Sequence, residues 1–434
     1  MKPVNVGICG LGTVGSGTFN VLSRNHDMIA AHTGRPISIA HIGARSNPYL
    51  CNTREIKFSE DIFQVAYDPD IDILVESIGG CDTARELVLT AIEQGKHVVT
   101  ANKALIAEHG STLFTAAKER GVVIAYEASV GGGIPIIKCL REGLSGNRIN
   151  WLAGIINGTG NYILSEMGDK NRSFNEVLEE AQALGFAEAD PTLDIEGTDA
   201  CHKLTIMASI AFGIPLQFHK AYTEGIGKIT PTDIQYAEEL GYRIKHLGIA
   251  RQQAKGIELR VNPALIPANQ PIANINGVLN TIVVDADAVG QTMYTGAGAG
   301  SEPTASSVVA DIIDIARSLS SNTHPVFSLG WSPDITYSSP SILPINEIKS
   351  GYYLRLQAED HPGVMNAITH ILSLNNININ AMTQKASRKN EVYADIVILT
   401  QQVQESVINK AIRDIEQLSD IASPITRIRI EPMV

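Results

Sequence analysis

Strand-like apolar runs alternate with helix-like repeats over the first 140 residues. Lys2–Ile8 is an apolar run of strand length, and Val14–Ala31 carries apolar residues at helical spacing. Three further apolar runs end in turn residues: Ile37–Ser46, Asp70–Gly80 and Gly95–Lys103. Helical patterns separate these runs, which predicts an α/β, Rossmann-like dinucleotide-binding domain with a parallel sheet over residues 1–140.

The pattern changes twice further along the chain. Residues 141–300 contain apolar strands such as INWLAGIIN and LNTIVVDADAVG, and predict an α+β substrate-binding and dimerisation domain with an open sheet. An amphipathic helix at about 301–320 is expected to return to the nucleotide domain. Ser338–Gly351, rich in Ser, Pro and Gly, predicts a linker. Residues 350–434 then read strand, helix, strand, strand, helix, strand, the βαββαβ order of a ferredoxin-like domain.

Composition narrows the class of protein. A chain of 434 residues exceeds the roughly 250–300 residues at which single cores stop growing, so several domains are expected. The net charge of -12 argues against nucleic acid or an anionic membrane as a partner. Five scattered cysteines without a CxxC pair predict reduced thiols, and the chain lacks a secretory stretch or an 18-residue apolar run. We therefore expect a cytoplasmic protein.

The glycines Gly10, Gly12 and Gly15 form a GxGxxG motif between the first strand and the first helix. In that context they predict a tight turn, close approach of the backbone to a pyrophosphate, and close packing of helix on strand. The alternative is a glycine-rich turn in an unrelated α/β domain. The second strand ends in Arg45 without an acidic residue, which favours NADP over NAD unless Arg45 is an ordinary surface side chain.

Candidate chemistry follows two later strands. Asn102 and Lys103 end one strand and are expected to face the nicotinamide, although Lys103 alone is also typical of a surface lysine. Glu127 precedes three glycines, Gly131–Gly133, a run that suits either oxygen coordination of a hard cation or a tightly packed turn. The residues alone do not decide between these two.

An acidic segment precedes a strongly apolar helix within Gly185–Gly213. Asp199 and Lys203 lie one helical turn apart, on the same face. A charged pair at the start of a buried helix predicts a catalytic pair, and the alternative is a surface ion pair worth under about 1 kcal/mol. His202 is about 100° around the helix from Lys203, so we do not expect the two to interact.

Six motifs, in order, resemble the monofunctional homoserine dehydrogenase family: GLGTVGSG, TANKALI, EASVGGGIPII, INGTGNYIL, AEADPTLDIEGTDACHKL and GAGAGSEPTASSVVADI. The resemblance implies an oxidoreductase that interconverts L-homoserine and L-aspartate 4-semialdehyde with NADP, or NAD, in threonine, methionine and isoleucine biosynthesis. Only three residues precede the first strand, so no aspartate kinase region is expected.

The resemblance also implies roles for residues. Lys203 matches the general acid/base and Lys103 a second essential lysine near nicotinamide and substrate, while Glu188 and Asp199 match substrate-binding acids. Cofactor contacts are implied, with Lys103, at Gly10, Gly12, Thr13, Val14, Gly15, Arg45, Gly185, Gly298 and Gly300. A monovalent cation site, usually sodium, is implied at Glu127, Val130, Gly132 and Ile134, three of them through backbone carbonyls.

The motif DHPGV in the last domain resembles an ACT regulatory domain. The resemblance implies amino-acid binding around Asp360, Gly363, Val364 and Asn378, with threonine as the natural effector of a homodimer or homotetramer. The alternative is a module that serves only assembly.

Two other functions compete. An aspartate-semialdehyde dehydrogenase would need an activated cysteine, and Cys139 and Cys201 have apolar neighbours without an evident histidine base. A catalytically silent NADPH sensor would not need Lys103 and Lys203 together with Glu188 and Asp199.

Overall fold

The computed structural model describes residues 2–47, 51–321, 326–332, 340–385, 393–422 and 424–433. They form two compact units that interleave along the chain. The first unit comprises residues 1–158, 199–221 and 279–340, and the second comprises 159–198, 222–278 and 341–434. Residues 338 and 339 of the predicted linker lie outside the described residues.

A six-stranded parallel sheet forms the centre of the first unit. Its strands are β1 (Val4–Cys9), β2 (Ile37–Gly43), β3 (Lys57–Ser59), β4 (Ile73–Glu76), β5 (His97–Thr100) and β6 (Ile124–Ala125). Their order in the sheet is β3-β2-β1-β4-β5-β6, and every pair is parallel. This order is that of a Rossmann fold, so the predicted dinucleotide-binding architecture is confirmed.

The helices of this part of the chain are α1 (Thr13–Arg24), α2 (His26–Thr33), α3 (Phe63–Tyr67), α4 (Asp82–Glu93), α5 (Lys103–Arg120), η1 (Glu127–Ser129), α6 (Ile136–Lys138), η2 (Cys139–Gly143), α10 (Thr198–Phe212), η3 (Phe218–Lys220) and α12 (Ser301–Ser321). The single helix predicted over Val14–Ala31 is wrong, because Asn25 leaves the helical conformation (φ -104°, ψ 18°) and divides it into α1 and α2.

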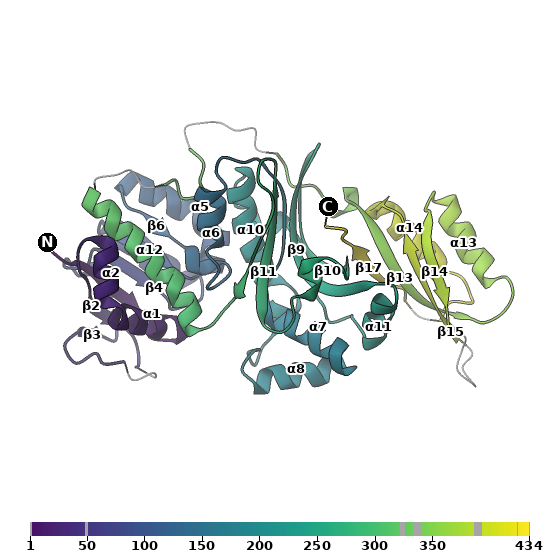
Figure 1. Ribbon diagram of the computed structural model, residues 1–434, viewed down its shortest axis with the longest axis horizontal. Helices are drawn as coiled ribbons and strands as arrows, with labels where there is room; N and C mark the ends of the chain where they lie inside the picture. The colour runs from purple at the N-terminus through teal and green to yellow at the C-terminus, as the bar shows by residue number, and fades with distance from the viewer. Residues whose placement is uncertain are drawn as a thin grey trace. The chain divides into compact units, whose positions relative to one another are not determined.

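Helix α12 packs against α1 and α2, as Figure 1 shows. The approach to α1 is close: a Cβ on Gly17 would lie 2.5 Å from the Ser301 carbonyl oxygen. The apolar side of α12, including Val308 and Ile312, joins the core cluster of β1 and β2. Helix α12 therefore buries its apolar side against the nucleotide-binding part of the first unit.

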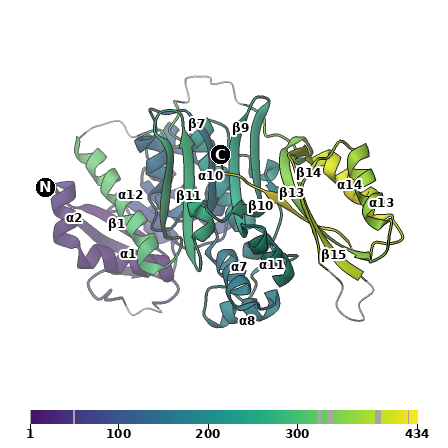
Figure 2. The same cartoon turned by 45° about the vertical axis from the view of Figure 1, so that its right-hand side comes forward.

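Three antiparallel strands complete the first unit: β7 (Ile149–Ile155), β11 (Leu279–Ala286) and β12 (Gly290–Ala297), in the order β12-β11-β7. Strand β12 alternates half-buried and exposed residues, whereas β11 is almost wholly buried. The difference reflects the position of β12 at the edge of this set of strands (Figure 2).

The second unit contains the long hairpin of β9 (Tyr242–Gln253) and β10 (Gly256–Pro267), with β8 (Tyr222–Thr223) parallel to β10. Its helices before the C-terminal domain are α7 (Gly158–Lys170), α8 (Phe174–Ala183), α9 (Thr192–Ile195), α11 (Pro231–Glu239) and η4 (Pro271–Asn274). Helices α7, α8 and α11 share one apolar cluster with Leu265 of β10.

The C-terminal domain belongs to the second unit. Its elements are η5 (Ile345–Glu347), β13 (Lys349–Glu359), α13 (Val364–Leu374), β14 (Ile379–Gln384), β15 (Tyr393–Thr400), β16 (Val403–Gln404), α14 (Glu405–Glu416) and β17 (Thr426–Ile430). The strand order β17-β13-β15-β14 is antiparallel throughout, with α13 and α14 sharing its core. The ferredoxin-like prediction is therefore confirmed.

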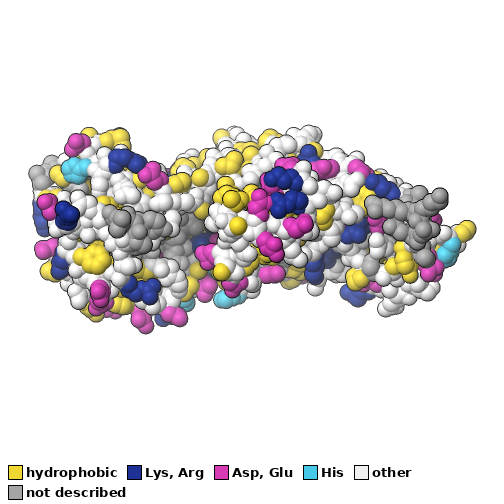
Figure 3. All heavy atoms as spheres, turned by 90° about the horizontal axis from the view of Figure 1, so that it is seen from below, with side chains coloured by type: hydrophobic (Ala, Val, Ile, Leu, Met, Phe, Trp, Pro, Cys, Tyr) yellow, Lys and Arg dark blue, Asp and Glu magenta, His cyan; other side chains and the backbone are white. Residues whose placement is uncertain are grey.

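Within the described ranges, none of the helices combines the length and apolar character needed to cross a membrane. On the face seen in Figure 3, acidic and basic side chains intermingle.

Candidate active site

The glycine-rich turn has the geometry that its motif predicts. Gly10 has φ +95°, and a Cβ there would lie 2.8 Å from the Ser77 carbonyl oxygen. A Cβ on Gly15 would lie 1.9 Å from the carbonyl oxygen of Gly10, so α1 packs directly on the turn. A Cβ on Gly12, the N-cap of α1, would have no other atom within 4 Å. Gly10 thus allows the tight turn, Gly15 allows the helix to pack on it, and Gly12 leaves the backbone open to approach.

A pocket of about 610 Å³ opens beside this turn. It is lined by Gly10 and Gly12 of the motif, by Arg45 after β2, and by residues that follow β3 and β4, including Glu60, Asp61 and Gly79. Thr13 and Val14 form the first turn of α1, where backbone N–H groups and the positive end of the helix dipole attract phosphate. The exposed Arg45 brings a positive charge to this pocket, and Glu60 and Asp61 bring negative ones.

Lys103 and Lys203 converge on Asp199. Lys103 is the first residue of α5, and its Nζ lies 3.0 Å from Asp199 Oδ1. Lys203 Nζ donates to Asp199 Oδ2 at 2.7 Å and to the Ile156 carbonyl oxygen at 2.7 Å. The first lysine is partly exposed (37% of its side chain) and the second nearly buried (11%). One carboxylate therefore joins two lysines from distant parts of the chain.

The ionic state of Asp199 follows from its neighbours. Burial disfavours its charge, but the ammonium groups of Lys203 and Lys103, with hydrogen bonds from Lys203 and from Asn157 Nδ2 (2.9 Å), outweigh burial and hold the pKa of Asp199 well below its usual range. Asp199 is thus a carboxylate at neutral pH. Three of its roughly four acceptor positions are used by Lys103, Lys203 and Asn157.

Sequence reasoning missed Asn157 and the partner of His202, which both help to build this arrangement. Asn157, just after β7, holds Asp199, and its place in the INGTGNYIL motif was the available signal. His202 Nε2 lies 3.2 Å from Glu108 Oε1, which ties α10 to α5, the two helices that carry the lysines. Asn102, which is expected from the sequence to face the nicotinamide, is the N-cap of α5: its Oδ1 accepts from Leu105 N–H and its Nδ2 donates to the Gly80 carbonyl oxygen.

The loop before α12 lies against two other predicted site segments. Gly133 N–H donates to the Ala297 carbonyl oxygen at 3.0 Å, and a Cβ on Gly298 would lie 2.0 Å from the Asn280 side chain. Gly300, with φ +124°, precedes Ser301, whose hydroxyl donates to the Thr13 carbonyl oxygen at 2.8 Å. The predicted cofactor residue Gly300 is therefore close in sequence to a contact with the glycine-rich turn.

The predicted cation site contains one buried carboxyl, that of Glu127. Both oxygens of Glu127 accept backbone N–H groups, from Ile137 (2.8 Å) and Lys138 (2.9 Å), and burial nevertheless raises the pKa of Glu127 to about 7. Gly131 (φ +76°) and Gly132 (φ +56°) turn the chain sharply. The Gly132 carbonyl accepts from Ser307 Oγ at 2.6 Å, and the Ile134 carbonyl from Ile136 N–H at 2.7 Å; Val130 precedes the turn.

Burial and the charge of Glu127 also raise the pKa of Asp311 to about 7, and its Oδ2 accepts from Glu127 N–H. The donor set of Glu127, Val130, Gly132 and Ile134 contains only oxygen, and each carbonyl has two lone pairs. Oxygen ligands are the kind that hard cations prefer, so the chemistry of these residues fits such an ion.

Gly185 and Glu188 belong to the second unit, in the exposed segment after α8. Gly185 has φ +75° and ends α8, and the Glu188 carbonyl accepts from Gln182 Nε2 at 3.1 Å. Thr159 Oγ1 holds this segment to α7 through the Phe186 carbonyl oxygen at 2.6 Å.

The predicted effector residues lie in the C-terminal domain. Gly363, with φ +105°, is the N-cap of α13 and is followed by the buried Val364. The exposed Asp360 and Asn378 hydrogen-bond to Gln384 and Gln401, at 3.1 and 3.3 Å.

The cysteine required by the competing enzyme reaction is not activated. Burial, with the charge of Glu127, raises the pKa of Cys139, so its thiol is protonated at neutral pH. Cys201 is buried in α10.

Comparison with known proteins agrees with this geometry. Residues 10–127 match the model of the homoserine dehydrogenase NAD-binding domain, 135–313 that of homoserine dehydrogenase, and 352–418 that of the ACT domain. A Pseudomonas aeruginosa homoserine dehydrogenase is 58% identical over 434 residues, covering 100% of both chains. The crystal structure of a Thiobacillus denitrificans homoserine dehydrogenase has a TM-score of 0.94 at 53% identity, covering 100% of this chain and 99% of the other.

A hyperthermophilic archaeal homoserine dehydrogenase in complex with NADPH has a TM-score of 0.61 at 26% identity, covering 72% of this chain and 98% of the other. The family models together span all three predicted regions, and the relatives align along the full chain. The chain belongs to the homoserine dehydrogenase family.

Proposed function

We propose that this protein interconverts L-homoserine and L-aspartate 4-semialdehyde with NADP(H), and that Lys203 is the general acid/base. The observation that carries the proposal is the convergence of Lys203 and Lys103 on the buried carboxylate of Asp199. The reaction places the protein in the biosynthesis of threonine, methionine and isoleucine.

Lys203 has the contacts expected of a proton carrier. An ammonium group has three N–H donors, and two of them are directed to the Ile156 carbonyl and to Asp199. The third is left for the hydroxyl or carbonyl oxygen of the substrate. Asp199 and Ile156 fix the Nζ so that proton transfer needs little rearrangement, which is the advantage of a positioned acid/base.

The remaining polar residues bind substrate in this proposal. Lys103 is the more exposed amine, so it contacts substrate and nicotinamide, while Asp199 binds the substrate ammonium. Bound NADP(H) would supply or accept the hydride. Asp199 thus has two tasks, since it also orients both lysines.

NADP is the favoured cofactor because Arg45 follows β2 and lines the pocket beside the glycine-rich turn. The archaeal relative that was solved with NADPH supports the same choice. Glu60 and Asp61 line the same pocket and oppose a 2′-phosphate there, so NAD is the alternative and selectivity depends on Arg45.

We also propose a sodium ion bound by Glu127 and by the carbonyl oxygens of Val130, Gly132 and Ile134. A cation there would offset the cost of burying the Glu127 and Asp311 carboxyls, both of which have raised pKa values. Its role would be structural, since it fixes the sharp turn at Gly131 and Gly132.

The ACT domain suggests feedback by an amino acid, and threonine is the proposed effector of a homodimer or homotetramer. The binding residues in this proposal are Asp360, Gly363, Val364 and Asn378. Saturating threonine should then change activity or raise the melting temperature, because a ligand that prefers the folded state stabilises it.

The function is tested by following NADPH absorbance with L-aspartate 4-semialdehyde in phosphate-free buffer. We expect steady oxidation of NADPH, and the reverse reaction with L-homoserine and NADP. An absence of turnover in both directions would contradict the proposal. Reduction of NADP by the semialdehyde only when phosphate is present would indicate the competing semialdehyde dehydrogenase.

A further inference from the structure

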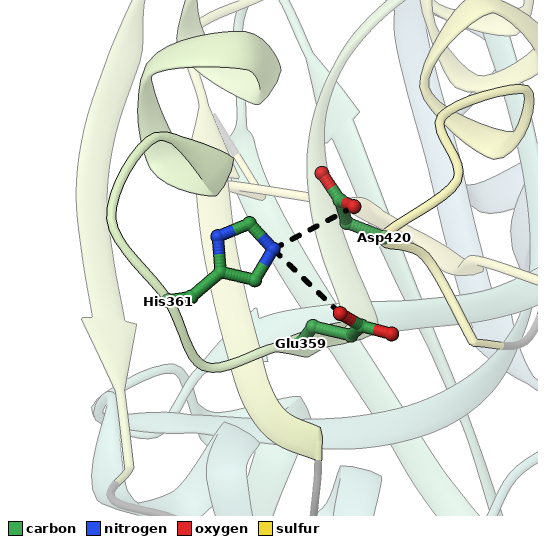
Figure 4. Close-up of side chains that lie close together, drawn as sticks. All are labelled: Glu359, His361 and Asp420. Atoms are coloured by element: carbon green, nitrogen blue, oxygen red, sulfur yellow. Dashed lines mark ion pairs between the residues drawn. The ribbon is translucent and has the colours of Figure 1, made fainter.

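Three side chains with metal-binding atoms converge on the surface of the C-terminal domain. Glu359 ends β13, His361 follows it in the loop before α13, and Asp420 lies in the turn after α14. Figure 4 shows both carboxylates directed to one nitrogen of the imidazole ring. His361 Nε2 lies 3.6 Å from Glu359 Oε2 and 3.6 Å from Asp420 Oδ1, and the three atoms all lie within 4.8 Å of one another.

Backbone pairing holds two of these residues together. Glu359 N–H donates to the Asp420 carbonyl oxygen at 2.8 Å, and a β-bridge joins Ala358 to Ile421. Ala422 N–H adds a bond to the Gln357 carbonyl at 2.9 Å. The two carboxylates are therefore brought near each other by pairing of the backbone segments that carry them.

The imidazole presents a specific nitrogen to the carboxylates. His361 Nδ1 lies 3.1 Å from the Pro362 carbonyl oxygen, which can only accept a hydrogen bond, so Nδ1 carries a proton. Nε2 then faces Glu359 and Asp420, and a bare lone pair there would repel both carboxylates. Nε2 is then the nitrogen that can bind a cation together with the two carboxylates.

The charges of the cluster are poorly balanced without a cation. In the portion of the chain that the structure describes, neither Glu359 nor Asp420 pairs with a lysine or an arginine. A cation held between the three side chains would balance the two carboxylate charges.

We propose that Glu359, His361 and Asp420 bind one divalent transition-metal ion of the Zn²⁺ class, with water completing the coordination. One imidazole nitrogen with two carboxylate oxygens suits zinc and its neighbours better than magnesium or calcium, which prefer oxygen alone. The bond from Nδ1 to the Pro362 carbonyl is the outer contact that metal-binding histidines usually make.

The site has a mechanical consequence for the domain. The metal would join the loop of residues 360–363, which leads into α13, to the turn after α14. Asp360 and Gly363, two of the proposed effector residues, lie in that loop. This inference does not depend on the proposed enzymatic reaction, since it rests on the C-terminal domain alone.

The test is calorimetric titration of Zn²⁺ into the full-length, chelator-treated protein at pH 7.5, with the visible spectrum of bound Co²⁺ as a second readout. The five free cysteines are a competing source of zinc sites, so variants identify the ligands. His361→Ala and Asp420→Asn should each lower the affinity for one equivalent of Zn²⁺ by at least about 10-fold and change the spectrum of bound Co²⁺. His370→Ala, which removes an exposed histidine of α13, is the matched control and should leave both unchanged.

Mg²⁺ at millimolar concentration should not displace the zinc. The proposal is overturned if the wild type binds no zinc. It is equally overturned if His361→Ala retains the affinity, stoichiometry and Co²⁺ spectrum of the wild type.

Discussion

Replacing Asp199 by asparagine tests the link between the two lysines. Asp199→Asn keeps the shape of the side chain and removes its charge. Lys203, with only 11% of its side chain exposed, then loses the carboxylate 2.7 Å from its Nζ, and Lys103 loses its own partner at 3.0 Å. Removing one partner of a buried ion pair typically costs about 3–5 kcal/mol, because the other charge is left uncompensated.

We expect the lower end of that range, about 3 kcal/mol at pH 7, because Lys103 is partly exposed and regains water.

The pH dependence of this loss has a definite sign. The pKa of Asp199 is depressed in the folded state, so its contribution is complete above the unfolded value near 3.9 and is lost as the pH falls toward the folded value. The difference between wild type and Asp199→Asn should therefore narrow below about pH 4.

Urea unfolding followed by tryptophan fluorescence measures this difference. Both tryptophans, Trp151 and Trp331, lie in the first unit, and the Trp331 indole donates to the Ile210 carbonyl oxygen of α10 at 2.6 Å. Glu179→Gln, an exposed carboxylate of α8, is the matched control and should not move the transition. An unchanged urea midpoint for Asp199→Asn at pH 7, or an equal loss of unfolding free energy at pH 7 and pH 3.5, would contradict this prediction.

Three further predictions concern the cofactor and cation sites. Arg45→Asp should shift the ratio of kcat/KM for NADP over NAD toward NAD by at least about 10-fold, and an unchanged ratio removes Arg45 from the phosphate site. Gly15→Ala should lower the free energy of unfolding by about 1–3 kcal/mol, because its Cβ would clash with the Gly10 carbonyl. Gly12→Ala should keep the wild-type melting temperature and weaken NADPH binding. Equal melting temperatures for the two variants would contradict this prediction. Because the pKa of Glu127 is raised in the folded state, the free energy of unfolding should fall as the pH rises from about 4 to 7. Glu127→Gln should reduce this pH dependence. Sodium chloride should also reduce it in the wild type, compared with the same concentration of tetramethylammonium chloride.

Local patterns predicted much of the nucleotide-binding region. The GxGxxG motif correctly indicated the tight turn at Gly10 and the close packing of α1 at Gly15, because both depend on the backbone within a few residues. The i, i+4 spacing likewise placed Asp199 and Lys203 in contact. Such features need only local geometry.

Long-range features were harder to predict. No periodicity relates Lys103 to Asp199 or Glu108 to His202, since these contacts depend on how α5 and α10 pack. The break between α1 and α2 at Asn25 was missed because apolar spacing continues across it. The return of α12 to the first part of the chain was predicted. The assignment of β11 and β12 to the same unit was not, because segment order alone does not show it.

The acid/base role of Lys203 is tested most directly by the rate of hydride transfer in Lys203→Ala, measured in a single turnover with NADPH and L-aspartate 4-semialdehyde. The affinity of the same variant for NADPH is measured by fluorescence. Lys220→Ala, an exposed lysine of η3, is the control. We predict that Lys203→Ala binds NADPH as the wild type does and transfers hydride at least about 100-fold more slowly. Hydride transfer at near the wild-type rate would show that Lys203 is not the acid/base.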